Sequence, residues 1–375
     1  MRTINADVVV VGLGAMGSQT LWRLAHRGVD VVGVEQFDIG HSRGASHGGS
    51  RIIRTAYAEG AAYVPLLLDS WRLWAELEKE SGTTLLDRTG GLMLGREDSP
   101  AITGSIASAE EHGLKYNVLN ARELHRLYPQ HRVAEDMMAV FEYDAGVVYP
   151  EKAVHAAVDA AVALGAQVVR GEAVEVEPGR VGLADGTTLT ARHVVVAGGG
   201  WTPRLVPGLA PHVRVVRRVV GWFAATAAYA ADRFPVFIRM DESWEHNWYG
   251  FPAIDGAVKL GLHAWPGIDE PVDPRAGVRP ADALDAARLG DIVAGTLPGV
   301  DPRPLRMATC MYSLTPDRHF LVGARDGLTV LGGFSGHGFK LAPAIGEAAA
   351  GLAVDGGSAL AIDLFDPRRF DDPGR

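Results

Sequence analysis

Cys310 is the only cysteine of the chain and the first candidate for a chemical role. It lies in the stretch MATCMYSLTPDRHF (307–320), between an apolar, strand-like run and a turn. A single thiol cannot form an internal disulfide, and it cannot build a zinc site alone. It can act as a nucleophile or as a covalent attachment point, most readily where positive groups lower its pKa. The alternative is a small buried hydrophobic residue, since free cysteine is among the most buried residue types.

Three basic residues are the next candidates. The stretch RIIR (51–54) supplies Arg51 and Arg54, and a guanidinium in a dry pocket suits a carboxylate because its fork meets two oxygens at once. The alternative is a pair of solvated arginines at the edge of a helix or strand. Lys259 lies in the apolar stretch AVKLGLH (257–263). The lysine alternates with apolar residues in this stretch, which favours an outward-facing side chain. The other interpretation is a buried cation beside a cofactor.

A glycine-rich unit, DVVVVGLGAMGSQTLWRLAHRGVDVVGVEQ (7–36), could hold such a cofactor. Its valine run predicts a buried parallel strand. Gly12, Gly14 and Gly17 follow in the G-x-G-x-x-G spacing, before an amphipathic helix and a second strand that ends on Glu35. The glycines allow a tight turn, close approach to a pyrophosphate and close helix–strand packing, and Glu35 can accept hydrogen bonds from a ribose. The unit predicts a dinucleotide site, but it does not distinguish NAD from FAD.

In two later stretches, residues 190–209 and 328–353, a predicted strand runs into a glycine-rich loop. These stretches favour FAD, because such loops can contact a second part of a long cofactor. Their wide spacing predicts an α/β fold with a Rossmann-like FAD-binding domain assembled from discontinuous segments. The second domain would bind substrate on a mainly antiparallel sheet. We assign residues 1–85, 146–217 and 310–375 to the first domain and residues 86–145 and 218–309 to the second.

Composition narrows the class of protein. A length of 375 residues fits one large or two intertwined domains, and a net charge of −9 argues against a nucleic-acid partner. The apolar run at residues 8–12 is far shorter than the ~20 residues of a membrane span. It also lacks a cleavage pattern of small residues, so we expect a cytoplasmic protein with no membrane association.

Five stretches carry a resemblance to a known family. They are GLGAMG (12–17), GASHGGSRIIRTAYAEGAAYVPL (44–66), WYGFPAIDGAVKLGLH (248–263), ATCMYSLTPDRHF (308–320) and GFSGHGFKLAPAIGE (333–347). In this order, and over nearly the whole chain, they resemble monomeric sarcosine oxidase and N-methyltryptophan oxidase, within the D-amino-acid-oxidase-like flavoproteins. GFSGHGFK and the segment around Cys310 are specific enough to indicate this subgroup.

The resemblance implies a role for each candidate. FAD would be attached to Cys310 through a thioether, Arg54 and Lys340 would anchor a substrate carboxylate, and Lys259 would activate oxygen. The substrate would be a secondary amine such as sarcosine or N-methyltryptophan, which loses a hydride to the flavin. The imine then hydrolyses, and oxygen is reduced to hydrogen peroxide. The resemblance also places four polar groups in the substrate pocket: Tyr249, His263, Tyr312 and His337.

The cofactor-binding residues that the resemblance implies, beyond the three glycines, Glu35 and Cys310, are Ala15, Met16, Gln36, Arg43, Ser46, His47, Ser50, Arg51, Val174, Gly199, Trp201, Met311, Phe334, Gly336, His337, Gly338, Phe339 and Lys340. We assign no metal site. Two positions depart from the family pattern: GGGW (198–201) and Gly49 stand where relatives often carry bulkier or acidic residues.

Several alternatives stay open. The aromatic residues of DESWEHNWYGF (241–251) could shrink the pocket for a small substrate, stack on a large one, or only pack between domains. A cyclic amino acid such as pipecolate or proline is another possible substrate. The enzyme could also be a dehydrogenase that passes electrons to a partner, and a non-catalytic FAD-binding protein is the remaining class. We expect a monomer whose partners are the amino-acid substrate and oxygen.

Overall fold

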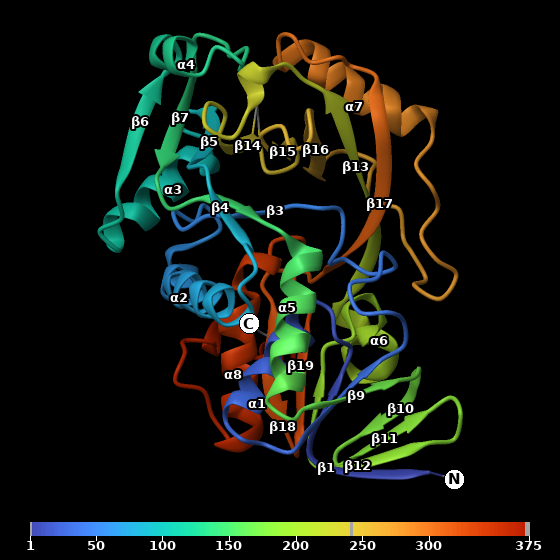
Figure 1. Ribbon diagram of the computed structural model, residues 1–375. Coiled ribbons are helices and arrows are strands. Elements are labelled where there is room, and N and C mark those ends of the chain that lie inside the picture. Colours follow the sequence, from blue (N-terminus) through green and yellow to red (C-terminus); the bar gives the residue numbers. More distant parts are fainter. Residues whose placement is uncertain (1, 241–242, 372–375) are drawn as a thin grey trace.

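The computed structural model describes residues 2–240 and 243–371, so two residues of the aromatic stretch 241–251 lie outside the described residues. Two large β-sheets lie one above the other, with a small three-stranded sheet between them (Figure 1). The chain passes between the two layers several times. Each layer is therefore assembled from segments that are far apart in the sequence.

The first sheet, in the lower half of Figure 1, has the strand order β10-β11-β12-β1-β2-β9, with β19 beside β12 and β18 beside β19. Its central strands β12, β1, β2 and β9 pair in parallel, as does β19 with β12. The strands are β1 Thr3–Val11, β2 Val31–Glu35, β9 Gln167–Arg170, β10 Ala173–Glu177, β11 Arg180–Leu183, β12 Thr188–Val196, β18 Leu321–Arg325 and β19 Leu328–Gly332.

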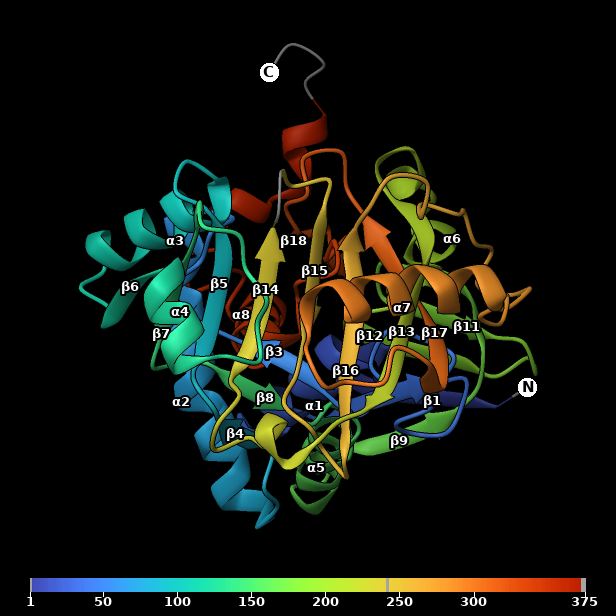
Figure 2. The ribbon, with the colours of Figure 1, turned by 90° about the horizontal axis from the view of Figure 1, so that it is seen from above.

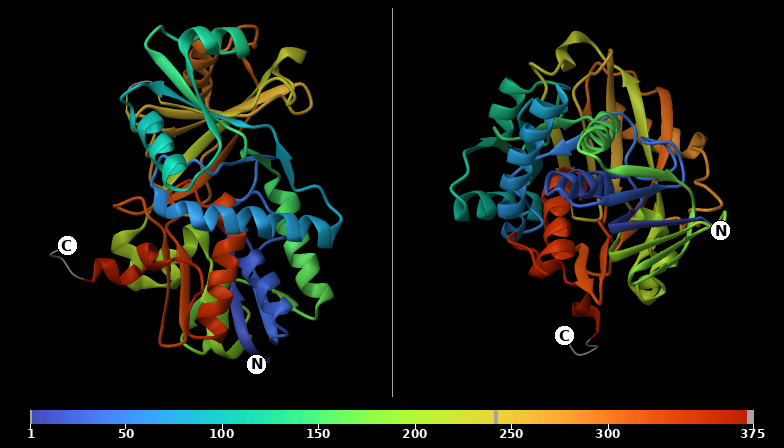
Figure 3. Two further views of the ribbon diagram at one scale, coloured as in Figure 1. Left: turned by 90° about the vertical axis from the view of Figure 1, so that its left-hand side faces the viewer. Right: turned by 60° about the horizontal axis from the view of Figure 1, so that its bottom comes forward.

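The valine run of β1 is buried on both faces of this sheet. Val8 and Val10 pack against helices, whereas Val9 and Val11 join a second cluster with residues of β10, β11 and the segment after α6. The covering helices are α1 Ala15–His26, α2 Val64–Ser81, α5 Pro150–Ala163 and α8 Ala342–Val354, and α6 is Thr202–Leu205. α2 crosses the molecule between the two layers and packs on α5 and α8 (Figure 3).

The second sheet has the order β17-β13-β16-β15-β14-β5-β7-β6, and seen from above α7 lies over the part of it that contains β16, β13 and β17 (Figure 2). All neighbours are antiparallel except β14 and β5. Its strands are β5 Gly91–Arg96, β6 Tyr116–Asn120, β7 Met137–Glu142, β13 Arg214–Ala224, β14 Val236–Met240, β15 Asn247–Gly250, β16 Ala257–Ala264 and β17 Pro304–Leu314. The helices of this layer are α3 Pro100–Glu111, α4 Ala121–Leu127 and α7 Ala283–Thr296.

The small sheet, β3-β8-β4, lies between the two layers. It consists of β3 Arg51–Ile53, β4 Leu86–Arg88 and β8 Gly146–Val148. The short 3₁₀ helices are η1 Ala61–Tyr63, η2 Gly199–Trp201, η3 Pro207–His212, η4 Ala227–Tyr229, η5 Phe339–Leu341, η6 Asp363–Phe365 and η7 Pro367–Phe370. None of the helices in the described ranges combines the length and the apolar character that a membrane crossing requires.

The predicted fold class is confirmed, since a largely parallel sheet covered by helices is joined to a mainly antiparallel second sheet, and both are assembled from discontinuous segments. The predicted domain boundaries after residues 217 and 309 fall inside β13 and β17, which both lie wholly in the second sheet. The division into two domains stays a prediction.

Candidate active site

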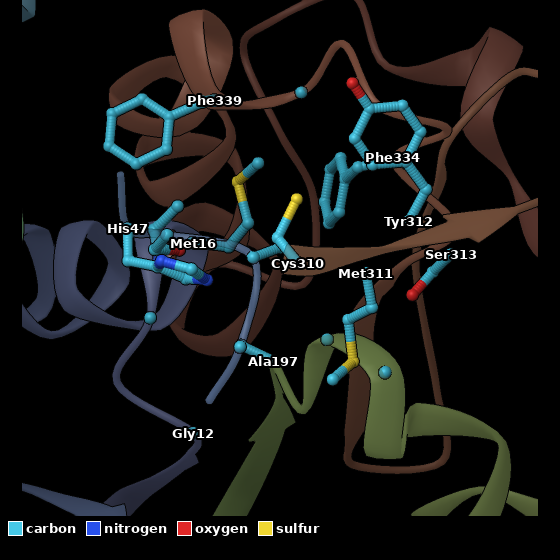
Figure 4. A pocket seen from close by; sticks show the side chains of 18 of the residues that line it. Gly12, Met16, His47, Ala197, Cys310, Met311, Tyr312, Ser313, Phe334 and Phe339 are labelled. Atoms are coloured by element: carbon cyan, nitrogen blue, oxygen red, sulfur yellow. The ribbon is translucent and has the colours of Figure 1, made fainter. Parts of the chain in front are cut away.

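A cavity between the two large sheets collects residues from most of the segments that the sequence singled out (Figure 4). Because β1, β2, β12 and β19 are parallel, the loops after them meet at one edge of the first sheet. The C-terminal half of β17, the stretch 40–54 and residues of β14, β15 and β16 also line the cavity. Residues from both ends of the chain therefore face one space.

The turn after β1 has room only for glycine at two positions. Gly12 has a φ of +89°, and a Cβ on Gly12 would lie 2.6 Å from the carbonyl oxygen of Ala197. A Cβ on Gly17 would lie 1.7 Å from the Gly12 carbonyl oxygen, so the first turn of α1 packs directly on the turn. Gly14 is the N-cap of α1 and leaves the helix N-terminus open to the cavity. This cradle has the shape that a dinucleotide phosphate requires.

We expect Gly17→Ala to destabilise the protein by about 3 kcal/mol or more, because the added methyl group overlaps backbone that cannot move away alone. The measurement is the melting temperature together with the FAD content of the purified protein. Gly208→Ala is the matched control, since its Cβ would meet nothing within 4 Å. Equal melting temperatures and FAD contents for the two variants would contradict the role of Gly17.

Glu35, at the end of β2, is an ionised acceptor inside the cavity. Its carboxylate accepts from the Leu13 amide at 2.9 Å and the Phe37 amide at 3.0 Å, and His41 lies 3.5 Å away. Burial alone would raise the pKa of Glu35, but the contacts with His41 and the two amides outweigh it and hold the pKa below its ordinary value. The remaining lone pairs can accept from ribose hydroxyls.

Cys310 lies on β17 with its sulfur pointing into the middle of the cavity, between Phe334 and Met16 (Figure 4). The side chain is buried. Burial raises the pKa of the thiol, while Arg51, Lys259 and Arg218 act in the opposite direction. Positive groups of the kind that favour a thiolate are therefore present, although burial dominates in the ligand-free chain.

Lys259 is a buried cation, although the pattern alone favoured an outward side chain. It is only 3% exposed, and its Nζ donates to the Gly48 carbonyl at 2.8 Å, the Ser50 carbonyl at 2.8 Å and the Ser50 hydroxyl at 3.2 Å. Its Nζ also lies 4.7 Å from the ring centroid of Phe251. Burial lowers the pKa of Lys259 well below its usual value, and the positive charge of Arg51 adds to this effect.

The outward reading of Lys259 is wrong because both faces of β16 are covered. Val258, Leu260 and Leu262 pack in the core with α7. The opposite face lies against the stretch 48–50, which contributes to the cavity wall. Alternation along one strand shows which side chains share a face, but not what lies over that face.

Arg54 is buried. Its guanidinium group is already paired with an acidic residue that the sequence analysis did not single out. The guanidinium forms an ion pair with Glu59, and its Nη1 donates to the Ala56 carbonyl at 3.0 Å. Burial opposes the charge of Glu59, but Arg54, His337 and Lys340 lower the pKa of its carboxyl to about 2. Both Arg54 and Glu59 line the cavity. The only sequence signal for Glu59 is its place five residues after the arginine.

Lys340, Tyr57 and His337 form a buried chain of hydrogen bonds. The Lys340 Nζ donates to the His337 carbonyl at 2.8 Å and to the Tyr57 hydroxyl at 3.3 Å. His337 Nε2 lies 3.1 Å from the Arg318 carbonyl, which can only accept. Nε2 therefore carries the hydrogen, and Nδ1 accepts from the Tyr57 hydroxyl at 2.7 Å. Burial, with Arg54 nearby, lowers the pKa of Lys340 to about 7, and burial lowers that of His337 to about 3.

Tyr249, Tyr312 and His263 supply neutral polar groups to the cavity wall. Burial raises the pKa of both phenols and lowers the pKa of His263 to about 4. Two glycines make space for the phenol rings. A Cβ on Gly261 would lie 2.6 Å from the Tyr249 hydroxyl, and one on Gly336 would lie 2.1 Å from the Tyr312 ring.

Most of the predicted site residues line this one cavity. These are Gly12, Gly14, Ala15, Met16, Glu35, Gln36, Ser46, His47, Arg51, Arg54, Gly199, Trp201, Tyr249, His263, Cys310, Met311, Tyr312, Phe334, Gly336, His337, Gly338, Phe339 and Lys340. Gly17, Ser50 and Lys259 lie behind its wall. Arg43 instead stacks on Phe37 with its guanidinium carbon 4.7 Å from the ring centroid, and Val174 is 44% exposed on β10.

Glu142, at the end of β7, is a second acidic residue that the sequence analysis missed. Its Oε2 accepts from the Thr55 amide at 3.0 Å and the Ala56 amide at 2.6 Å, and so it holds the turn that follows Arg54. Burial raises the pKa of Glu142 to about 7. No local motif marks this carboxylate, because its partners are separated from it by more than eighty residues of chain.

Comparison with known proteins agrees with this geometry. Residues 7–352 match the family of FAD dependent oxidoreductases named DAO. Monomeric sarcosine oxidase from Streptomyces avermitilis is 38% identical, with 97% of each chain covered. N-methyl-L-tryptophan oxidase from Yersinia pestis is 33% identical and covers 98% of this chain and 100% of its own. The solved structure of NikD, an amino acid oxidase of nikkomycin biosynthesis, has a TM-score of 0.84 at 27% identity, with 97% and 98% covered.

The chain belongs to the DAO family of FAD-dependent oxidoreductases, in the group of sarcosine-oxidase-like amine oxidases. The predicted family and class of enzyme are confirmed. The residues present also fit FAD, since the glycine cradle, Glu35 and the loop 333–340 all line the same cavity.

Proposed function

We propose that the enzyme oxidises the secondary amine of an N-alkyl amino acid, with FAD attached to Cys310 through a thioether and oxygen as the electron acceptor. One observation carries this proposal: Arg54 and Lys340 reach the same buried cavity as the only thiol of the chain. Bound FAD supplies the acceptor for two electrons from the amine and the donor of two electrons to oxygen. The products are an imine, which water hydrolyses, and hydrogen peroxide.

Two buried cations suit the carboxylate of the substrate. The bidentate fork of Arg54 and the ammonium of Lys340 together hold both oxygens, provided that the substrate carboxylate competes with Glu59 for Arg54. The same cations disfavour a protonated substrate amine, since like charges repel in a site of low polarity. His263 and His337 are neutral above a pH of about 4, so neither adds a positive charge to the site near neutral pH.

Anaerobic mixing with sarcosine, N-methyltryptophan, pipecolate and proline tests the proposal. At least one N-methyl amino acid is expected to bleach the flavin absorbance, and aerobic turnover is expected to release peroxide. Faster bleaching by pipecolate or proline would assign a cyclic substrate. Bleaching without peroxide would indicate a dehydrogenase, and no bleaching at all would indicate a non-catalytic protein. We expect the enzyme to act as a monomer.

Carboxylate binding is expected to weaken as pH rises through about 7. Lys340, whose pKa is about 7, loses its positive charge over this range, while Glu142, whose pKa is also about 7, gains a negative one. Both changes act against an anion, whereas Arg54 stays charged. The dissociation constant of propionate, followed by the flavin spectrum, is expected to rise about tenfold between about pH 6 and about pH 8.

Lys340→Met is expected to remove most of this pH dependence. Lys115→Met, on the exposed surface, is the control that should retain it. Equal affinity for propionate at both pH values in the unsubstituted enzyme would rule out Lys340 as an anchor that titrates.

A further inference from the structure

Of the alternatives left open for the stretch 241–251, packing away from the cavity is the one that its two tryptophans follow. Trp248 is 1% exposed and packs in the core of the second sheet, where its ring meets Phe237 edge to face at 5.2 Å. Trp244 packs against a separate cluster around Met93 and Met240. The residues of β15 that line the cavity are Asn247 and Tyr249, which share one face of the strand.

Asn247 contributes a buried polar side chain to this wall. It is 3% exposed, and its Oδ1 is buried with no hydrogen bond from any residue in the described ranges. A buried amide oxygen without a donor costs free energy, and most such groups in native proteins are paired. The carboxamide can present either its oxygen or its NH₂ group by rotation, so it can pair with a donor or an acceptor.

Asn247 lies beside two other residues of β14 and β15 that line the cavity. Tyr249 follows two residues later on the same face, about 6.5 Å along the strand. Ile238, which pairs with Tyr249 across β14 and β15, adds an apolar surface to the same wall. The two carboxylate anchors come instead from the turn after β3 and from η5. Because the proposed function assigns the carboxylate of the substrate to Arg54 and Lys340, a group that meets Asn247 is expected to belong to the side chain of the substrate.

We propose that Asn247 determines specificity by hydrogen-bonding a neutral polar group, such as a hydroxyl or a carboxamide, on the side chain of the substrate. This inference rests on the proposed amino-acid oxidase function and names the class of substrate. In the free enzyme a water molecule can pair with the amide. A polar substituent that displaces this water replaces its hydrogen bond, whereas an apolar substituent of the same shape leaves the amide unpaired.

The test compares kcat/KM for matched pairs of substrates that differ only in polarity. N-methylthreonine is paired with N-methylvaline, and N-methylasparagine is paired with N-methylleucine. We expect the unsubstituted enzyme to prefer the polar member of at least one pair about tenfold or more. Asn247→Leu is expected to abolish or reverse that preference. Asn117→Leu is the control, because Asn117 is exposed on β6 and donates to the Tyr143 hydroxyl at 2.8 Å.

Two results would overturn the inference. The first is a ratio of kcat/KM for the polar substrate to kcat/KM for the apolar substrate that is near one in the unsubstituted enzyme, or that Asn247→Leu leaves unchanged. The second is a large fall in the melting temperature of ligand-free Asn247→Leu, which would show that the amide supports the fold. We expect Asn247→Leu to melt at the same temperature or higher. Both results differ from failure of the proposed function, in which no N-methyl amino acid bleaches the flavin.

Discussion

Lys259→Met is expected to slow reoxidation of the reduced enzyme by oxygen by a factor of about 10² to 10³. Electron transfer to oxygen creates negative charge, and a cation close by stabilises it. At an effective dielectric near 20, a unit charge ~4 Å away contributes about 4 kcal/mol, which is nearly three powers of ten in rate. Lys259 is suited to this role because its ammonium is buried and fixed by three oxygen acceptors.

Stopped-flow measurement of the two half-reactions separates this role from a general defect. Anaerobic reduction by substrate and flavin attachment are expected to change little in Lys259→Met, while reoxidation collapses. Lys152→Met is the matched control, since Lys152 also lies over an aromatic ring, 4.6 Å from the centroid of Tyr149, but is exposed. An unchanged rate of reoxidation in Lys259→Met would remove the proposed role.

The second large effect is expected for Cys310→Ser, which should release the flavin when the protein is denatured. Acid-precipitated wild-type polypeptide is expected to stay yellow, with a mass that includes FAD. The variant precipitates as a colourless chain of bare mass, because serine offers no thiolate to form the bond. β17 places the sulfur for this role by pointing it into the cavity (Figure 4), and the charges of Arg51 and Lys259 act on the thiol there.

Ser313→Ala is the control for Cys310→Ser. Ser313 lies on the same strand and lines the same cavity, but its substitution leaves the thiol in place. This variant should retain its colour after precipitation. Colourless wild-type polypeptide would show that the flavin is held without a covalent bond, and the lone cysteine would then be a buried packing residue.

Local patterns predicted a large part of this protein. The spacing of Gly12, Gly14 and Gly17 predicted the nucleotide cradle, because the local geometry of the turn itself requires residues without a side chain. The strands that precede the glycine-rich loops were also predictable, since a buried parallel strand appears in the sequence as an unbroken run of apolar residues. Most of the site residues that the family resemblance predicted line the cavity.

Other features depend on contacts between distant segments. The pattern alone favoured an outward-facing Lys259, because periodicity along β16 cannot show that both faces of the strand are covered. The burial of Trp248 and the exposure of Asn247 to the cavity follow from which face of β15 turns inward. A one-residue shift in the register of that strand would exchange them.

The amino-acid sequence by itself determined the cradle, the single thiol and the kinds of charged group available to the site. Only the tertiary structure decided their ionisation and their partners. The fork of Arg54 meets Glu59, and Lys340 reaches Tyr57 across 283 residues of chain. The physical reason is that desolvation and Coulomb interaction depend on distance through space and on burial. Neither distance through space nor burial can be obtained from the order of the residues in the sequence.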